Sequence, residues 1–298
     1  MSASLPHASQ DGRAAAAERV RHPWSRSLRK VLRDRRAMFG VTIVAVTILM
    51  ALFAPLLAPY DPNRPDFMAA LQGPTADHFF GTDELGRDVF TRILYGARVS
   101  LMVGIVAVFG SLAAGGLIGI IGGYLGGFWD TLLMRLMDVL FAFPSILLAL
   151  AITAVLGPSL TNAMIAIGIV YVPVFARLAR GQVLTVRELA FVEASVALGA
   201  RRITIMLRHI APNIIGPLII QGSLLFAAAI ITESYLSFLG LGIQPPTPSW
   251  GNMLRNAMSF LGMAPWMAAF PGIAIFFVVL GFNLLGDGLR DLFDPRNG

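Results

Sequence analysis

The sequence predicts an all-α polytopic membrane protein with about six transmembrane helices and both termini in the cytoplasm. Three observations lead to this prediction. Of the 298 residues, 56% are hydrophobic and only 13% are charged, and the mean hydropathy is +0.72, values outside those of soluble domains. Several apolar runs approach the ~20 residues that a helix needs to cross a bilayer. Arginines gather at the ends of these runs, as they do beside cytoplasmic membrane surfaces.

Residues 1–37 are predicted to form a cytoplasmic tail followed by an interfacial helix. The first 23 residues lack apolar periodicity and have the composition of an unstructured tail. Beyond them, Trp24, Leu28 and Leu32 fall on one helical face, with basic residues elsewhere, a pattern typical of a helix on the inner leaflet. Residues 38–298 are predicted to form the transmembrane domain.

Six segments of this domain are predicted to cross the membrane, and the third is short unless it begins near Met134. With the N-terminus inside, 18 of the 23 Lys and Arg residues fall in cytoplasmic segments and five in outer segments. This imbalance favours the chosen orientation. The expected spans are Met38–Ala58, Ser100–Tyr124, Phe141–Leu156, Ala163–Ala179, Asn213–Leu239 and Met267–Leu285.

The first outer loop contains acidic residues that are predicted to cap a helix and form ion pairs. Gly81-Thr82-Asp83 is a plausible helix start, and Asp88 and Arg92 lie four apart on the helix that should follow. The spacing of the acids fits no familiar oxygen cage for a metal ion. In the second outer loop, Trp250 and Trp266 are expected in a headgroup-level aromatic belt.

Glycines recur at four-residue spacing in the second predicted span. Gly115, Gly119 and Gly123 form one series, and Gly122 and Gly126 form a parallel pair. Small residues at this spacing let two helices approach closely, so the span is predicted to pack tightly against a neighbour.

The segment from about 185 to 212 is predicted to be a polar, membrane-adjacent loop of two short helices. Gly199 permits a bend between them, and Pro212 suits the first turn of the next span. The second helix has an apolar stripe at helical spacing, consisting of Ile203, Met206, Leu207 and Ile210. Such a surface suits docking onto another protein, and the alternative is a loop that lies on the lipid headgroups.

Several chemical functions lack the residues that they need. There is no Cys, and the lone Lys30 follows no Gly-rich turn, so thiolate chemistry and a phosphate-binding loop are excluded. All four His residues lie outside the spans and no HExxH occurs, so no catalytic residue and no metal site is predicted. The net charge of +6 is attributed to membrane topology and not to nucleic-acid binding. Glu233 lies inside an apolar run, near its outer end, and is a candidate for the substrate pathway or gate, with Gln221 and Asn283 as weaker candidates.

Several separate motifs resemble the permease subunits of ATP-binding-cassette (ABC) importers in the dipeptide, oligopeptide and nickel family. Glu193-Ala194-Ser195, Gly199 and Ile210-Ala211-Pro212 resemble the family's EAA loop, although that loop usually has Ala in place of Ser195 and Leu in place of Ala211. HFFGTDELGRDVFTR, from His78, resembles a second family segment. SFLGLG, from Ser237, and FNLLGDGLRD, from Phe282, follow in the family's order.

The resemblance implies a non-catalytic permease subunit of an importer for di- or oligopeptides in a bacterial inner membrane. Its EAA coupling residues would be Glu193, Ala194, Ser195, Gly199, Ile210 and Pro212. The implied partners are a second, homologous permease, two ABC ATPase subunits that bind ATP and Mg²⁺, and an extracytoplasmic substrate-binding protein, so this chain would carry no cofactor. The same machinery importing glutathione or nickel is one alternative. A stand-alone channel or secondary transporter is the other.

Overall fold

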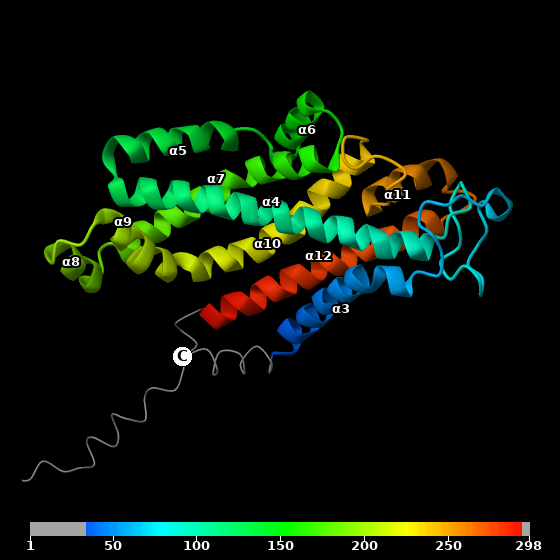
Figure 1. Ribbon diagram of the computed structural model, residues 1–298, viewed down its shortest axis with the longest axis horizontal. Helices are drawn as coiled ribbons and strands as arrows, with labels where there is room; N and C mark the ends of the chain where they lie inside the picture. Colours follow the sequence, from blue (N-terminus) through cyan, green and yellow to red (C-terminus); the bar gives the residue numbers. More distant parts are fainter. Residues whose placement is uncertain (1–33, 294–298) are drawn as a thin grey trace, which may run out of the picture.

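The computed structural model describes residues 34–293, and apart from an isolated bridge between Thr82 and Asp88 its regular elements are all helical (Figure 1). This confirms the predicted class. The tail and most of the predicted interfacial helix lie outside the described residues. Within residues 34–293, five helices are long and apolar enough to cross a membrane. They are α3 (Arg35–Leu57), α4 (Val89–Leu125), α7 (Leu160–Val186), α10 (Ala211–Phe238) and α12 (Trp266–Phe293).

The third predicted span, over Phe141–Leu156, is wrong as a continuous helix. Two helices, α5 (Gly127–Phe141) and α6 (Ser145–Leu156), meet at an angle of 89° and together pass as one possible crossing. The break has a local cause, because Pro144 has no N–H to donate and sits in an extended conformation. With 12 residues α6 is about 18 Å long, too short to cross alone.

The helices α4 and α7 are longer than their apolar runs predict, and α12 likewise continues past the predicted end at Leu285 to Phe293. The helix α4 begins at Val89 and has 37 residues. It begins there because the carboxylate of Asp88 caps it by accepting the N–H of Thr91 at 2.7 Å. Gly81-Thr82-Asp83 therefore does not start the helix. The helix α7 continues past the predicted end at Ala179 to Val186, so Arg180 lies within it and not in a loop.

The glycines at four-residue spacing bring α4 and α7 into close contact. A Cβ atom at Gly115 would lie 2.5 Å from the carbonyl oxygen of Val172, and one at Gly119 would lie 2.4 Å from that of Ala176. At Gly123 a Cβ would be 3.0 Å from Val183. The predicted small-residue interface is confirmed for this series, since no side chain larger than hydrogen fits without a shift.

The acidic residues of the first outer loop form ion pairs, as predicted. Asp83 Oδ2 lies 2.7 Å from Arg87 Nε and 3.5 Å from Arg92 Nε, and Glu84 Oε1 accepts from Arg87 Nη2 at 3.0 Å. Asp88, besides capping α4, contacts His78 Nδ1 at 3.0 Å. These contacts hold the loop between α3 and α4, which includes the short helix η1 (Phe67–Ala69), against the end of the helical bundle.

Trp250 is wrongly predicted as a member of a headgroup-level aromatic belt, whereas for Trp266 that position stays a prediction. Trp250 is the first residue of α11 (Trp250–Ala257), which continues into η3 (Met258–Phe260). The side chain of Trp250 is buried against Gly96 of α4. Trp266 is half-buried and donates its indole N–H to the carbonyl oxygen of Thr82 at 3.0 Å. Both rings therefore join the outer segments to the bundle.

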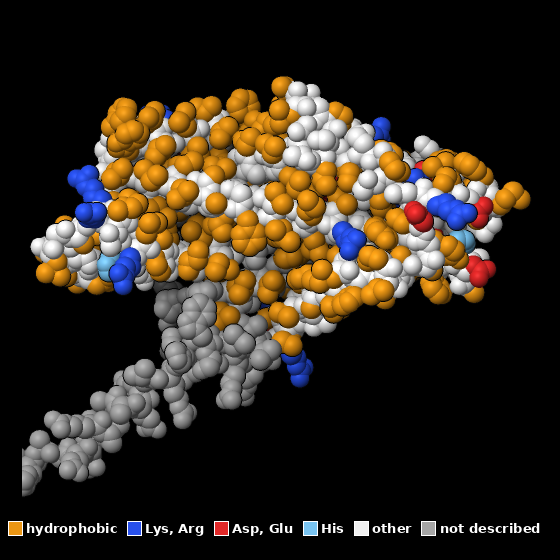
Figure 2. Space-filling view, in the orientation of Figure 1, with side chains coloured by type: hydrophobic (Ala, Val, Ile, Leu, Met, Phe, Trp, Pro, Cys, Tyr) orange, Lys and Arg blue, Asp and Glu red, His pale blue; other side chains and the backbone are white. Residues whose placement is uncertain are grey.

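The surface agrees with a membrane protein. In Figure 2, hydrophobic side chains cover most of the visible face along the middle of the bundle, and charged side chains gather mainly at its two ends. One end carries the outer loop between α3 and α4, and the opposite end carries the segment between α7 and α10 (Figure 1).

Candidate functional site

The segment between α7 and α10 is the candidate functional site, because it projects from one end of the bundle (Figure 1). It contains α8 (Ala190–Ala197), α9 (Arg202–Thr204) and a π-helical turn, η2 (Ile205–Ile210). Only Val192 of α8 is buried and joins the main hydrophobic core. One residue thus anchors α8, and the rest of its surface is available.

The exposed surface of α8 combines polar and apolar side chains. Glu193 and Ala194 are exposed, and Ser195 donates its hydroxyl to the carbonyl oxygen of Phe191 at 2.8 Å. That bond satisfies the hydroxyl within its own helix. Val196 is also exposed, and Leu198 at the tip is 88% exposed. Exposed apolar side chains on a polar loop suit contact with another surface.

The bend after α8 depends on Gly199. Its φ of +76° lies in the left-handed region, which side-chain-bearing residues rarely adopt. The N–H of Gly199 donates to the carbonyl of Val196 at 2.9 Å, and that of Ala200 donates to Ser195 at 3.1 Å. This pair of bonds is a Schellman motif, which ends a helix and turns the chain. The predicted role of Gly199 as the bend is confirmed.

The second half of the loop differs from the predicted α-helical stripe. In η2 the N–H of Ala211 donates to the carbonyl of Met206, five residues back. Pro212 follows in the first turn of α10 and has no N–H for a normal helical bond. The wider turn buries Ile205 and Ile210, which are five apart. Of the expected stripe Ile210 is buried and Met206 half-buried, whereas Ile203 and Leu207 are exposed.

A groove of about 380 Å³ runs behind α8, between this helix and the ends of α4 and α7. Its lining includes Glu193, Arg202 and Tyr124. Arg187, also in the lining, donates to the carbonyl oxygen of Gly123 at 3.1 Å and so fixes the end of α7 to α4. The loop therefore rests on two crossing helices and runs directly into a third, α10.

The predicted pathway residues do not form one site. Glu233 is fully buried in α10, its Oε1 accepts from the hydroxyl of Ser237 at 2.7 Å, and its Oε2 has no hydrogen-bond partner among the described residues. Gln221 is half-buried on the same helix, twelve residues earlier, or about 18 Å away. Asn283 is half-buried on α12. Their role in a pathway stays a prediction.

Among residues 34–293, no group of three or more His, Cys, Asp or Glu side chains is placed to hold a metal ion. A charged groove lies between α5 and α7 and is not among the predicted sites. Asp130 and Arg180 lie outside the predicted spans, and the signal that could have found the groove is the eight-residue spacing of Asp130 and Asp138, which brings both to one side of a helix.

Comparison with known proteins identifies the family. Residues 115–298 match the family described as the binding-protein-dependent transport system inner membrane component. This chain belongs to that family. Residues 22–74 also match the N-terminal transmembrane domain of oligopeptide transport permease C. The chain is therefore a multi-pass inner-membrane permease of an ABC transport system, as the motifs indicated.

Curated relatives match nearly the full chain. It is 49% identical over 274 residues to the dipeptide transport system permease protein DppC of Alkalihalophilus pseudofirmus, covering 92% of this chain and 90% of that one. It is 47% identical over 280 residues to the glutathione transport system permease protein GsiD of Escherichia coli O6:K15:H31, covering 94% and 92%. Among solved structures, a chain of the inward-facing MetNI methionine ABC transporter has the same fold, with a TM-score of 0.55, 15% identity, and coverage of 68% of this chain and 97% of that one.

Proposed function

We propose that this permease is one of two membrane-spanning subunits of an ATP-driven importer for dipeptides and other short peptides. The observation that carries the proposal is the projecting α8 loop, with its exposed apolar tip at Leu198 and its left-handed bend at Gly199. The 49% identity to a dipeptide permease supports the peptide substrate. Two ABC ATPase subunits would hydrolyse ATP, and an extracytoplasmic binding protein would deliver the peptide.

The geometry supports a mechanical role for the loop. The ATPase would hold α8 by Glu193, Ala194 and the exposed apolar residues around them. Because η2 continues into α10 without a break, a displacement of the loop would move the loop and α10 together. Arg187 ties the start of the loop to α4 through Gly123, so α4 and α7 would move with it. These helices would have two arrangements, one open to each side of the membrane. ATP binding and hydrolysis would shift the equilibrium between them, which gives alternating access.

Glutathione is the second candidate substrate, since the 47% identity to a glutathione permease is nearly as high. Glutathione is itself a tripeptide, so the same machinery would serve it. Nickel import has no comparable support from these relatives. A stand-alone channel or secondary transporter would need no ATPase, and the exposed tip of α8 would then lack a partner.

Uptake by cells tests the proposal. A strain lacking this chain should lose uptake of labelled dipeptide, and plasmid-borne chain should restore it. Longer peptide, glutathione and nickel are measured in parallel. Loss of glutathione uptake alone would favour the second candidate, and loss of nickel uptake alone would overturn the substrate class. Affinity purification of the chain should also recover ATPase subunits, and their absence from the intact complex would contradict the ABC mechanism.

A further inference from the structure

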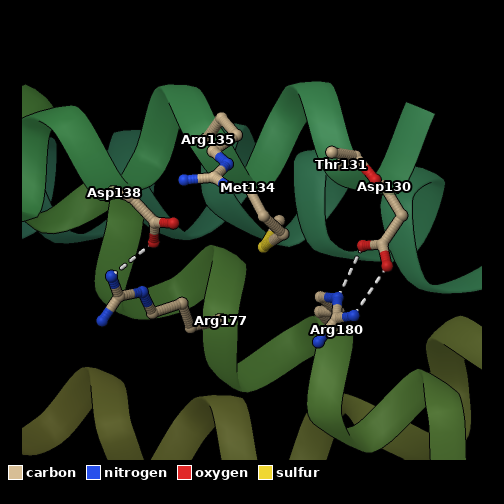
Figure 3. Close-up of a pocket in the computed structure, with 7 residues that line it drawn as sticks. All are labelled: Asp130, Thr131, Met134, Arg135, Asp138, Arg177 and Arg180. Atoms are coloured by element: carbon tan, nitrogen blue, oxygen red, sulfur yellow. Dashed lines mark hydrogen bonds and ion pairs between the residues drawn. The ribbon is translucent and has the colours of Figure 1, made fainter. Parts of the chain in front are cut away.

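The broken span and its neighbour enclose a charged groove of about 660 Å³ (Figure 3). Two acids and an arginine come from α5, and two arginines come from α7. The helix α7 is a crossing helix, and α5 belongs to the bent pair that can form another. Charges in such segments face water or another chain, because facing lipid is costly. The five charged residues are Asp130, Arg135, Asp138, Arg177 and Arg180.

The apolar side of α5 points away from this groove. Its exposed apolar residues fall at three- and four-residue spacing and form a stripe opposite the charged one. The stripe suits lipid or an apolar protein surface. The charged side, by contrast, needs an aqueous or polar environment, so the groove is the wet side of α5. The stripe consists of Trp129, Leu132, Leu136 and Val139.

One ion pair in the groove is a structural clamp. Asp130 and Arg180 form two parallel contacts, from Oδ1 to Nε at 2.5 Å and from Oδ2 to Nη2 at 2.6 Å (Figure 3). Such a bidentate pair fixes both position and orientation. The Asp130 side chain is only 17% exposed. This pair therefore holds α5 against α7 and leaves little charge available to a ligand.

The other charged groups are available. Asp138 and Arg177 share one short contact, 2.6 Å from Oδ1 to Nη2, and their side chains are 53% and 43% exposed. Arg177 also stacks over the ring of Phe141, with 4.2 Å from Cζ to the ring centroid. Arg135 is exposed and has no ion-pair partner within residues 34–293, and in Figure 3 it lies on the same groove. Exposed pairs of this kind contribute little to stability and exchange partners readily.

We propose that this groove binds the charged termini of a zwitterionic short peptide during its passage through the membrane. Arg135, with Arg177, would take the terminal carboxylate, and Asp138 would take the terminal ammonium, replacing its contact with Arg177. A guanidinium fork matches a carboxylate in charge and in shape. The volume lies within the range of small-molecule sites. Every peptide has these two termini, so the groove would accept peptides whatever their side chains. The inference rests on the proposed peptide substrate.

The test uses the complete transporter, with both permeases, the ATPases and the binding protein, reconstituted in vesicles. Uptake of a labelled dipeptide is compared with that of its C-terminal amide and its N-acetyl form. The variants are Arg135→Gln, which breaks no ion pair within the described chain, and Asp138→Asn. Arg290→Gln removes an exposed arginine from the last turn of α12 and is the control. The same binding protein is present throughout, so its own preference cancels between variants.

We expect Arg135→Gln to reduce the preference for the dipeptide over its amide by about tenfold, and Asp138→Asn to reduce the preference over the N-acetyl peptide by a similar factor. The Arg290→Gln complex should keep both wild-type preferences. Equal losses for all three peptides, or no change from wild type, would overturn the groove assignment while leaving peptide import intact. A wild-type complex that fails to transport the dipeptide would overturn the proposed substrate and the groove assignment with it.

Discussion

The indole N–H of Trp250 donates a 3.2 Å hydrogen bond to the main-chain oxygen of Ile93, 157 residues away. The bond joins the first residue of α11 to α4. The approach is close, since a Cβ at Gly96 would lie 2.8 Å from Trp250 Cδ1. The short helix α11 is therefore fixed to a crossing helix by a buried ring and cannot lie freely on the membrane surface.

Removal of this ring should destabilise the permease. We expect Trp250→Ala to cost about 3–5 kcal/mol through lost packing and the cavity left behind. Trp250→Phe keeps most of the packing and loses the hydrogen bond, so it should cost about 1–2 kcal/mol. The thermal midpoint of the purified complex measures both. Trp129→Ala, at an exposed position on α5, is the control. Equal midpoints for the two alanine variants would contradict the anchoring role of Trp250.

The α4–α7 contact should be sensitive to a single methyl group. A Cβ at Gly119 would lie 2.4 Å from a main-chain oxygen, which cannot swing aside as a side chain can. Gly119→Ala should therefore cost about 1–3 kcal/mol, as overpacking does in cores. Gly110→Ala is the matched control on the same helix, because a Cβ there meets nothing within 4 Å. The yield of detergent-solubilised permease complex and its thermal midpoint should fall for Gly119→Ala and not for Gly110→Ala.

Gly199 should be required for coupling and not for membrane insertion. Proline cannot adopt its φ of +76°, and other L-residues pay about 1–3 kcal/mol there. We expect Gly199→Pro to abolish substrate-stimulated ATP hydrolysis while the complex still inserts, and Gly199→Asn to retain more of it, because Asn tolerates this conformation. Gly181→Ala, in α7 with open space around its Cβ, is the control. Normal stimulation in the proline variant would refute the coupling assignment.

The tip of α8 should bind the ATPase through Leu198. Its side chain is 88% exposed, so Leu198→Asp removes no contact within the described chain and should leave the permease folded. It should instead reduce ATPase recovery on affinity purification by at least about tenfold, as loss of an interface anchor does. Met68→Asp is the control, since it alters a methionine that is 91% exposed in η1, in the loop between α3 and α4 and outside the crossing helices. ATPase recovery that falls equally in both variants would argue against a local contact at α8.

Local patterns predicted those features that depend on local geometry. The glycine series of α4 was evident because its spacing matches a helical face, and Gly199 was evident because a bend between two short helices needs a left-handed residue. The burial of Trp250 was not evident, since it depends on Gly96, which is 154 residues away in the chain. The π-helical turn at 205–210 was missed because its five-residue spacing resembles a slightly irregular α-helix.

The charged groove was missed for a different reason. The predicted span Ala163–Ala179 contains Arg177 and ends just before Arg180, because the prediction from hydropathy ends where the apolar residues end. The main-chain hydrogen bonds of a helix need no apolar side chains, so α7 continues to Val186. Asp130 and Asp138 on α5 supply the opposite charges that stabilise this continuation. Hydropathy locates the apolar part of a crossing helix, whereas ion pairs between helices decide how far it extends.

Glu233 offers a test that separates packing from transport. It is fully buried, and it accepts a hydrogen bond from Ser237 on the next turn of α10. Glutamine has the same shape and can still accept that bond, so Glu233→Gln should stay within about 1 kcal/mol of wild type in stability. Glu233→Ala removes the carboxylate that accepts the O–H of Ser237 and opens a cavity, at a cost of about 2–4 kcal/mol.

Because this carboxylate is fully buried, we expect Glu233→Gln to import labelled dipeptide at the wild-type rate and Glu233→Ala to lose activity in proportion to its lower yield. Uptake per assembled complex, with yield measured on the same samples, distinguishes the two effects. The opposite pattern, in which Glu233→Gln assembles normally and fails to transport, would mean that the negative charge itself serves the outer gate. Glu233 would then belong to the pathway, as its position inside an apolar run first indicated.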